Sequence, residues 1–67
     1  MISDKVEFEQ WLVGQQADVG TYRRMMGLFQ RVDPARRILV LMQTRDGATL
    51  RETEEYIFSL LVRKEFE

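Results

Sequence analysis

Residues 33–67 decide the fold, and they read DPARRILVLMQTRDGATLRETEEYIFSLLVRKEFE. Asp33 is of the residue type that caps a helix start, and Pro34 suits the first helical position because its missing N–H is not needed there. Asp46-Gly47 then predicts the end of this helix, since glycine readily takes the left-handed conformation at a helix C-terminus.

A further helix follows this glycine and is expected to run from about residue 50 to residue 64 or beyond. Thr49 and Glu52 have the spacing of a capping box, in which each side chain bonds the other residue's backbone N–H. Apolar residues lie on both arms, at positions 38–42 and 56–62. The sequence therefore predicts an antiparallel helical hairpin.

The run Ile38-Leu39-Val40-Leu41-Met42 leaves a second interpretation open, because it is apolar without a helical period. It would also fit a buried strand, with Arg45-Asp46-Gly47 as a turn and residues 48–51 as the partner strand. That alternative is an α+β fold with a short hairpin at about 37–51. The helical interpretation is favoured because leucine and methionine outnumber β-branched residues and the start signal is that of a helix.

The first predicted helix begins near Ser3 or Asp4, where Asp4 and Glu7 have the spacing of a capping box. Gly14 is its expected end. Its apolar stripe falls at helical spacing and comprises Phe8, Trp11 and Leu12. We expect the tryptophan to be a core anchor, since large aromatic side chains dominate burial in small domains.

The second predicted helix begins with Asp18 or Thr21 as its cap and ends before Pro34, because the residue before proline avoids helical angles. It carries the clearest amphipathic pattern of the chain, formed by Tyr22, Met25, Met26, Phe29 and Val32. Gly27 lies off the centre of this stripe and is either a surface glycine or a point of close helix approach. The chain is thus expected to be one all-α domain, 1–67, a compact bundle of three to four short helices.

Composition restricts the classes of function. The chain has 67 residues, no cysteine and no histidine, so neither a disulfide nor the commonest general base or metal ligand is present. No stretch approaches the roughly 20 apolar residues of a membrane span, and Asp4, Glu7 and Glu9 stand where a signal peptide needs apolar residues. We expect a soluble, cytoplasmic protein that does not bind membranes.

Catalysis finds little support among the polar residues. Ser3 and Ser59 are the only serines, and no histidine is available to activate them. The carboxylates Glu52, Glu54 and Glu55 are too few for an oxygen-only metal site and suit the positive end of a helix instead. No catalytic, cofactor-binding or metal-binding residue is therefore predicted, and the protein is expected not to be an enzyme.

The arginines are the most informative polar residues. Residues 21–45 carry six arginines against one aspartate, a net charge of +5, whereas residues 1–20 and 46–67 each carry −3. One explanation is internal pairing, with Arg45 facing the Glu52–Glu55 end of the hairpin and Arg36-Arg37 lying toward Glu65 and Glu67. The other is an acidic partner surface or a nucleic-acid backbone.

The predicted function is a small protein–protein interaction module, an adaptor, regulator or assembly factor. The last two helices carry more apolar surface than one stripe, which indicates a homodimer or a hetero-complex. The candidate partner-binding residues are Arg23, Arg24, Arg31, Arg36, Arg37, Leu41, Phe58 and Val62. The alternative is a regulator that resembles a helix-turn-helix protein and binds nucleic acid through the basic middle segment, although Glu52, Glu54 and Glu55 at the start of the last helix would face phosphates.

Overall fold

A computed structural model of the chain describes residues 3–66, with side chains described through Lys64. The described residues form four α-helices and no strand. The helices are α1 (Asp4–Gly14), α2 (Val19–Arg31), α3 (Pro34–Arg45) and α4 (Leu50–Phe66). The all-α prediction is confirmed, and the alternative strand hairpin at 37–51 is wrong because α3 occupies most of that range.

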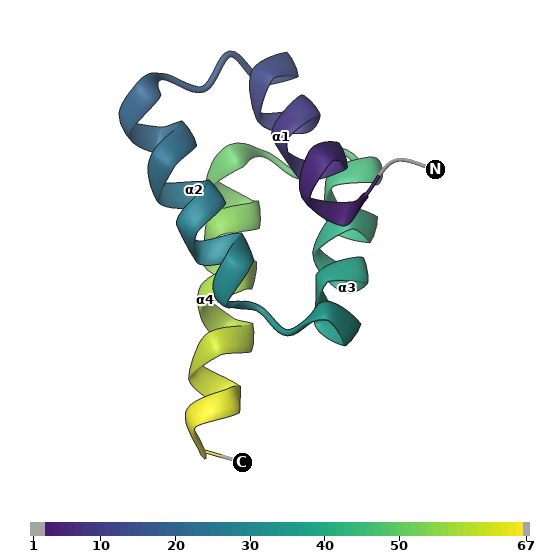
Figure 1. The fold of residues 1–67 in the computed structure, drawn as a ribbon, viewed down its shortest axis with the longest axis vertical. Helices are drawn as coiled ribbons and strands as arrows, with labels where there is room; N and C mark the ends of the chain where they lie inside the picture. Colours follow the sequence, from purple (N-terminus) through teal and green to yellow (C-terminus); the bar gives the residue numbers. More distant parts are fainter. Residues whose placement is uncertain (1–2, 67) are drawn as a thin grey trace.

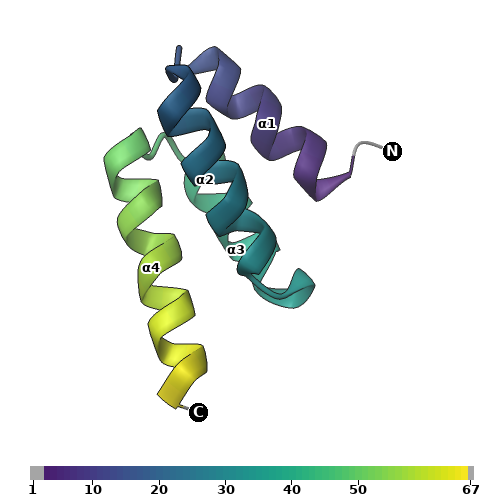
Figure 2. The same ribbon diagram turned by 60° about the vertical axis from the view of Figure 1, so that its left-hand side comes forward.

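The helices form a closed ring of contacts in which each packs on two others. The packed pairs are α1 with α2, α1 with α3, α3 with α4, and α2 with α4. Figure 1 shows α2 and α4 descending side by side, while α1 and α3 run in the opposite sense. Figure 2 shows α2 lying between α1 and α4. The predicted antiparallel pairing of the last two helices is confirmed, and α4 extends beyond the ends of its neighbours.

Side-chain caps open the first two helices. Ser3, and not the predicted Asp4, caps α1, because its Oγ accepts a hydrogen bond from the Val6 N–H at 3.2 Å. Asp18 caps α2 by accepting from the Thr21 N–H at 2.7 Å. These bonds satisfy N–H groups that have no partner within the helix.

The predicted signals around α3 and α4 are confirmed. The Asp33 carboxylate accepts from the Arg36 N–H at 3.2 Å, directly before Pro34. Gly47 has φ of 91°, a conformation that favours glycine, and it ends the turn after α3. Thr49 and Glu52 then exchange the two hydrogen bonds of a capping box, at 2.9 and 3.1 Å.

The core lies inside the ring and receives side chains from all four helices and from the α2–α3 corner. Its members are Phe8, Leu12, Met25, Met26, Leu28, Phe29, Val32, Val40, Leu41, Ile57 and Leu60. Trp11 is only partly buried and packs against this cluster. Leu28 and Thr53 are buried although neither belongs to a predicted stripe. Four short helices can therefore close one core within a single copy of the chain.

Candidate interaction surfaces

Neither a metal-holding group nor a membrane-spanning helix is found among the described residues. They contain no group of three acidic residues, histidines or cysteines placed to hold a metal ion. None of the described helices is long and apolar enough to cross a membrane.

Arg37 is used inside the molecule. Its guanidinium donates to the backbone carbonyls of Val32 and Gln30 at 2.8 and 2.9 Å. It also lies 3.6 Å from the Asp4 carboxylate and 5.6 Å from the centre of the Phe29 ring. These contacts join α3 to α1 and to the end of α2, so the Arg37 guanidinium already has partners within the chain.

Arg45 corrects the predicted pairing within the hairpin. Its guanidinium donates two hydrogen bonds to the Glu7 carboxylate of α1, both at 2.8 Å, and does not face the Glu52–Glu55 end of α4. The hydrogen bond from Arg45 holds the pKa of Glu7 below its ordinary value. The expected partners of Arg36 and Arg37 at the end of the chain, Glu65 and Glu67, have side chains outside the described residues.

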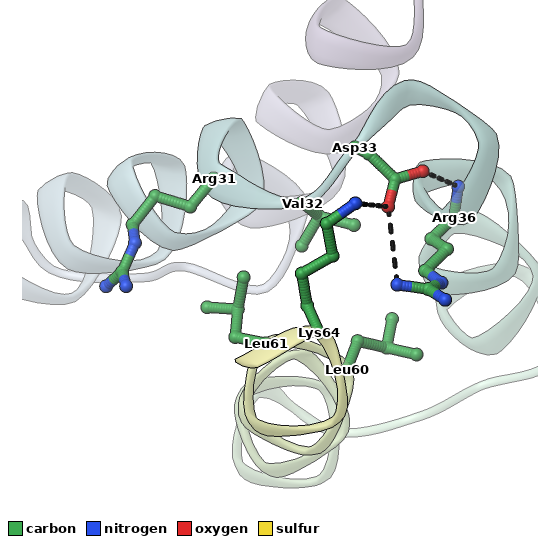
Figure 3. A pocket seen from close by; sticks show the side chains of 7 residues that line it. All are labelled: Arg31, Val32, Asp33, Arg36, Leu60, Leu61 and Lys64. Carbon is green, nitrogen blue, oxygen red and sulfur yellow. Dashed lines mark hydrogen bonds and ion pairs between the residues drawn. The ribbon is translucent and has the colours of Figure 1, made fainter. Parts of the chain in front are cut away.

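A small cavity of about 40 Å³ opens where the α2–α3 corner meets α4. Its floor is apolar, formed by Val32, Leu60 and Leu61. Arg36 and Lys64 reach the Asp33 carboxylate at 3.6 and 4.0 Å from either side. Figure 3 shows that Arg31, on the rim of the same cavity, points away from Asp33.

A second bidentate contact joins α2 to α4. The Arg24 guanidinium bonds both oxygens of the Glu54 carboxylate, at 2.6 and 3.5 Å, and this bond raises the pKa of Arg24. Phe58 and Val62 follow Glu54 at four-residue steps, so they continue the same row along α4. Their side chains are 47% and 50% exposed. An apolar row on α4 thus begins beside the arginines of α2.

Arg24 and Arg31 of α2 lie on the side that faces α4, since Arg24 pairs with Glu54 and Arg31 lines the cavity with Leu61. Arg24, Gly27 and Arg31 share one face at three- and four-residue steps, with Arg23 one turn before the glycine. Among the described residues, no carboxylate forms an ion pair with Arg23 or Arg31, and both side chains are exposed. We define the α2–α4 face as Arg23, Arg24, Gly27, Arg31, Phe58 and Val62.

A separate apolar surface lies on the outside of α3. Ile38, Leu39 and Met42 are 55%, 39% and 50% exposed, and their spacing places them on one side of the helix. We call these three residues the α3 face. Leu41 does not join them, because it is only 3% exposed and points into the core. Its assignment to a contact surface is therefore corrected. The apolar run 38–42 supplies buried residues to the core and exposed residues to the α3 face.

The chain matches no family model, no curated protein and no solved structure. Of the eight predicted partner-binding residues, Arg24 and Arg31 lie beside α4, Arg23 is exposed on α2, and Phe58 and Val62 are exposed on α4. The position of Arg31 beside Leu61 was not predicted, because it depends on how α2 packs against α4.

Proposed function

We propose that this chain is a protein–protein interaction module without enzymatic activity, a small adaptor, regulator or assembly factor. It acts as a homodimer or within a hetero-complex. One observation carries this proposal: the core is complete, and yet Ile38, Leu39, Met42, Phe58 and Val62 stay exposed. Exposed apolar side chains that gather on one face are typical of sites that bind other proteins.

The two faces support different modes of association. The α3 face is apolar and suits pairing with a second copy, since a two-fold interface uses the same surface on both partners. The α2–α4 face combines apolar side chains with arginines, a composition that is enriched at interfaces between different proteins. A module with both faces can bind a partner and a second copy simultaneously.

Light scattering and site-specific photo-cross-linking test the proposal. A photoreactive phenylalanine analogue replaces Leu39 or Phe58 in the host cells, and the same analogue at the exposed Gln10 is the control. We expect protein cross-links from position 39 or 58 and none from position 10. A monomer at every concentration, together with no cross-linked protein from either position, would contradict the proposal.

Nucleic-acid binding is the second candidate, because Arg23 and Arg31 leave positive charge on α2 without a described acidic partner. Against it, Glu54 and Glu55 lie on α4 near the same face, and the chain carries a net charge of −1. The affinity for a DNA fragment at a series of salt concentrations tests this candidate, since phosphate contacts weaken steeply as the salt concentration rises.

A further inference from the structure

Two arginines of α2 form no ion pair with a described carboxylate of the chain. Five described carboxylates pair with cationic side chains within the chain, namely Asp4, Glu7, Asp33, Glu54 and Glu55. Asp18 and Glu52 accept hydrogen bonds from backbone N–H groups at helix starts. Arg23 and Arg31 receive no such partner from the described residues. A partner that neutralises them has to bring its own carboxylates.

Apolar surface lies beside these two arginines. The contact between Arg24 and Glu54 holds α2 against the N-terminal part of α4. Nearer the C-terminus of α4, the cavity places Arg31 beside Leu61. Phe58 lies between these two levels, because it follows Glu54 by one turn. Half-exposed Phe58 therefore lies between the levels of Arg24 and Arg31, and half-exposed Val62 follows Leu61 at the level of Arg31.

Gly27 adds a third feature to the same face. Within α2 a glycine costs about 1 kcal/mol relative to alanine. A Cβ built on Gly27 meets no atom within 4 Å, so no contact inside the molecule requires a glycine. Glycine on a helix surface permits the backbone of another molecule to approach closely. The glycine lies one turn from each of the two arginines, where a partner backbone would cross.

We infer that the α2–α4 face binds an acidic amphipathic helix of a different protein, whose apolar side chains cover Phe58 and Val62 and whose carboxylates pair with Arg23 and Arg31. This inference rests on the proposed function and narrows it to one kind of partner. A second copy fits the face poorly. Glu9 accepts a hydrogen bond from the Tyr22 hydroxyl, so Asp46 is the one described carboxylate that accepts no hydrogen bond or ion pair, and it lies at the end of α3. Nucleic acid fits poorly as well, because phosphates gain nothing from Phe58 and meet Glu54 and Glu55.

Fluorescence anisotropy with synthetic probes tests this inference on the full chain. The main probe is a helical peptide of about 18 residues with leucines at three- and four-residue spacing and glutamates elsewhere. A second peptide replaces every glutamate by lysine, and a third replaces every leucine by serine. A duplex DNA of about 20 base pairs is the fourth probe. We expect binding of the glutamate–leucine peptide at least about tenfold tighter than that of the other probes.

Three variants locate the binding site. Arg31→Glu and Phe58→Asp are each expected to weaken binding of the glutamate–leucine peptide at least about tenfold, through repulsion and through loss of apolar contact. Lys5→Glu makes the same change of charge on α1 and is expected to leave the affinity unchanged. Gly27→Ala is expected to weaken binding while raising the melting temperature, whereas Gly14→Ala, where a Cβ also meets no atom within 4 Å, leaves the affinity unchanged.

Several results would overturn the inference. They are equal binding of the lysine–leucine peptide, tighter binding of the DNA, no binding of the glutamate–leucine peptide, and full affinity in Arg31→Glu or Gly27→Ala. Failure here is distinguishable from failure of the proposed function. Cross-links to another protein from position 39 or 58 without acidic-peptide binding would keep the general function and reject this partner class.

Discussion

Phe8 of α1 and Phe29 of α2 stack face to face, with ring centres 4.2 Å apart and planes inclined by only 5°. Both rings are fully buried, and Arg37 lies over Phe29 at 5.6 Å. The stack joins the two N-terminal helices at the centre of the core.

Phe29→Ala is expected to remove a large part of the free energy of unfolding of the chain. Removing a buried phenylalanine costs about 3 to 5 kcal/mol, and a domain of this size has a total stability of about 3 to 10 kcal/mol. Circular dichroism during urea titration measures the effect. Phe58→Ala is the control, because its half-exposed ring leaves no cavity and its removal should cost less than about 1 kcal/mol. Equal loss in both variants would contradict this description of the core.

Thr53→Val should raise the free energy of unfolding by about 1 kcal/mol. Thr53 is fully buried, and its hydroxyl has no hydrogen-bond partner among the described residues. Burying an unpaired hydroxyl is unfavourable, and valine has nearly the same shape. Thr44→Val is the matched variant: the Thr44 hydroxyl donates to the Leu41 carbonyl at 2.7 Å, so the gain there should be smaller. Chemical denaturation of both variants compares them.

Two glycines should respond in opposite directions to alanine. Gly27→Ala is expected to stabilise α2 by about 1 kcal/mol, because the position is helical and open. Gly47→Ala is expected to destabilise the chain by about 1 to 2 kcal/mol, because φ of 91° is strained for a residue with a side chain. Thermal melts of the two variants should therefore shift to opposite sides of the parent chain.

Acid should weaken the fold partly through Glu7. Its pKa is lowered in the folded state by the hydrogen bond from Arg45, from an ordinary value of 4.5. A carboxyl group with a lowered folded pKa stabilises the fold above its ordinary pKa, and this stabilisation is lost as the pH falls through the lowered value. Asp18 adds to the same acid loss, because the Thr21 N–H lowers its pKa.

Glu7→Gln should therefore reduce the decline of unfolding free energy between neutral pH and about pH 3. Urea denaturation at a series of pH values measures the slope. Glu55→Gln is the control, since its ion pair with Arg51 is largely exposed and contributes little to stability. A slope unchanged in Glu7→Gln would show that the bond to Arg45 is not formed in solution.

Local signals made much of this fold predictable from the sequence. The cap and turn signals depend only on residues that are close in the sequence, namely Asp33-Pro34, Gly47 and the Thr49–Glu52 pair. The bounds of α3 and the start of α4 therefore follow directly from them. Ser3 was the harder case, because Asp4 beside it offers a competing cap. The sequence could not distinguish them without the helix geometry.

The surfaces were less predictable, because they depend on contacts between distant residues. The pairing of Arg45 with Glu7 spans 38 positions, and no spacing rule connects them. Leu41 lies in an apolar run without a period, so the sequence did not show which of its members face inward. The α2–α4 face depends on the packing of α2 against α4, which the arginine pattern alone did not specify.

Arg37 couples the folding of distant parts of the chain. Its side chain contacts Asp4 of α1 and the carbonyls of Gln30 and Val32, while its backbone belongs to α3. An opening of α1 that pulls Asp4 away therefore also disturbs the corner that carries Arg31. Amide hydrogen exchange in α1 and at this corner should consequently proceed as one cooperative unit. A change that loosens α1 should therefore also raise the exchange rate at the end of α2, beside Arg31.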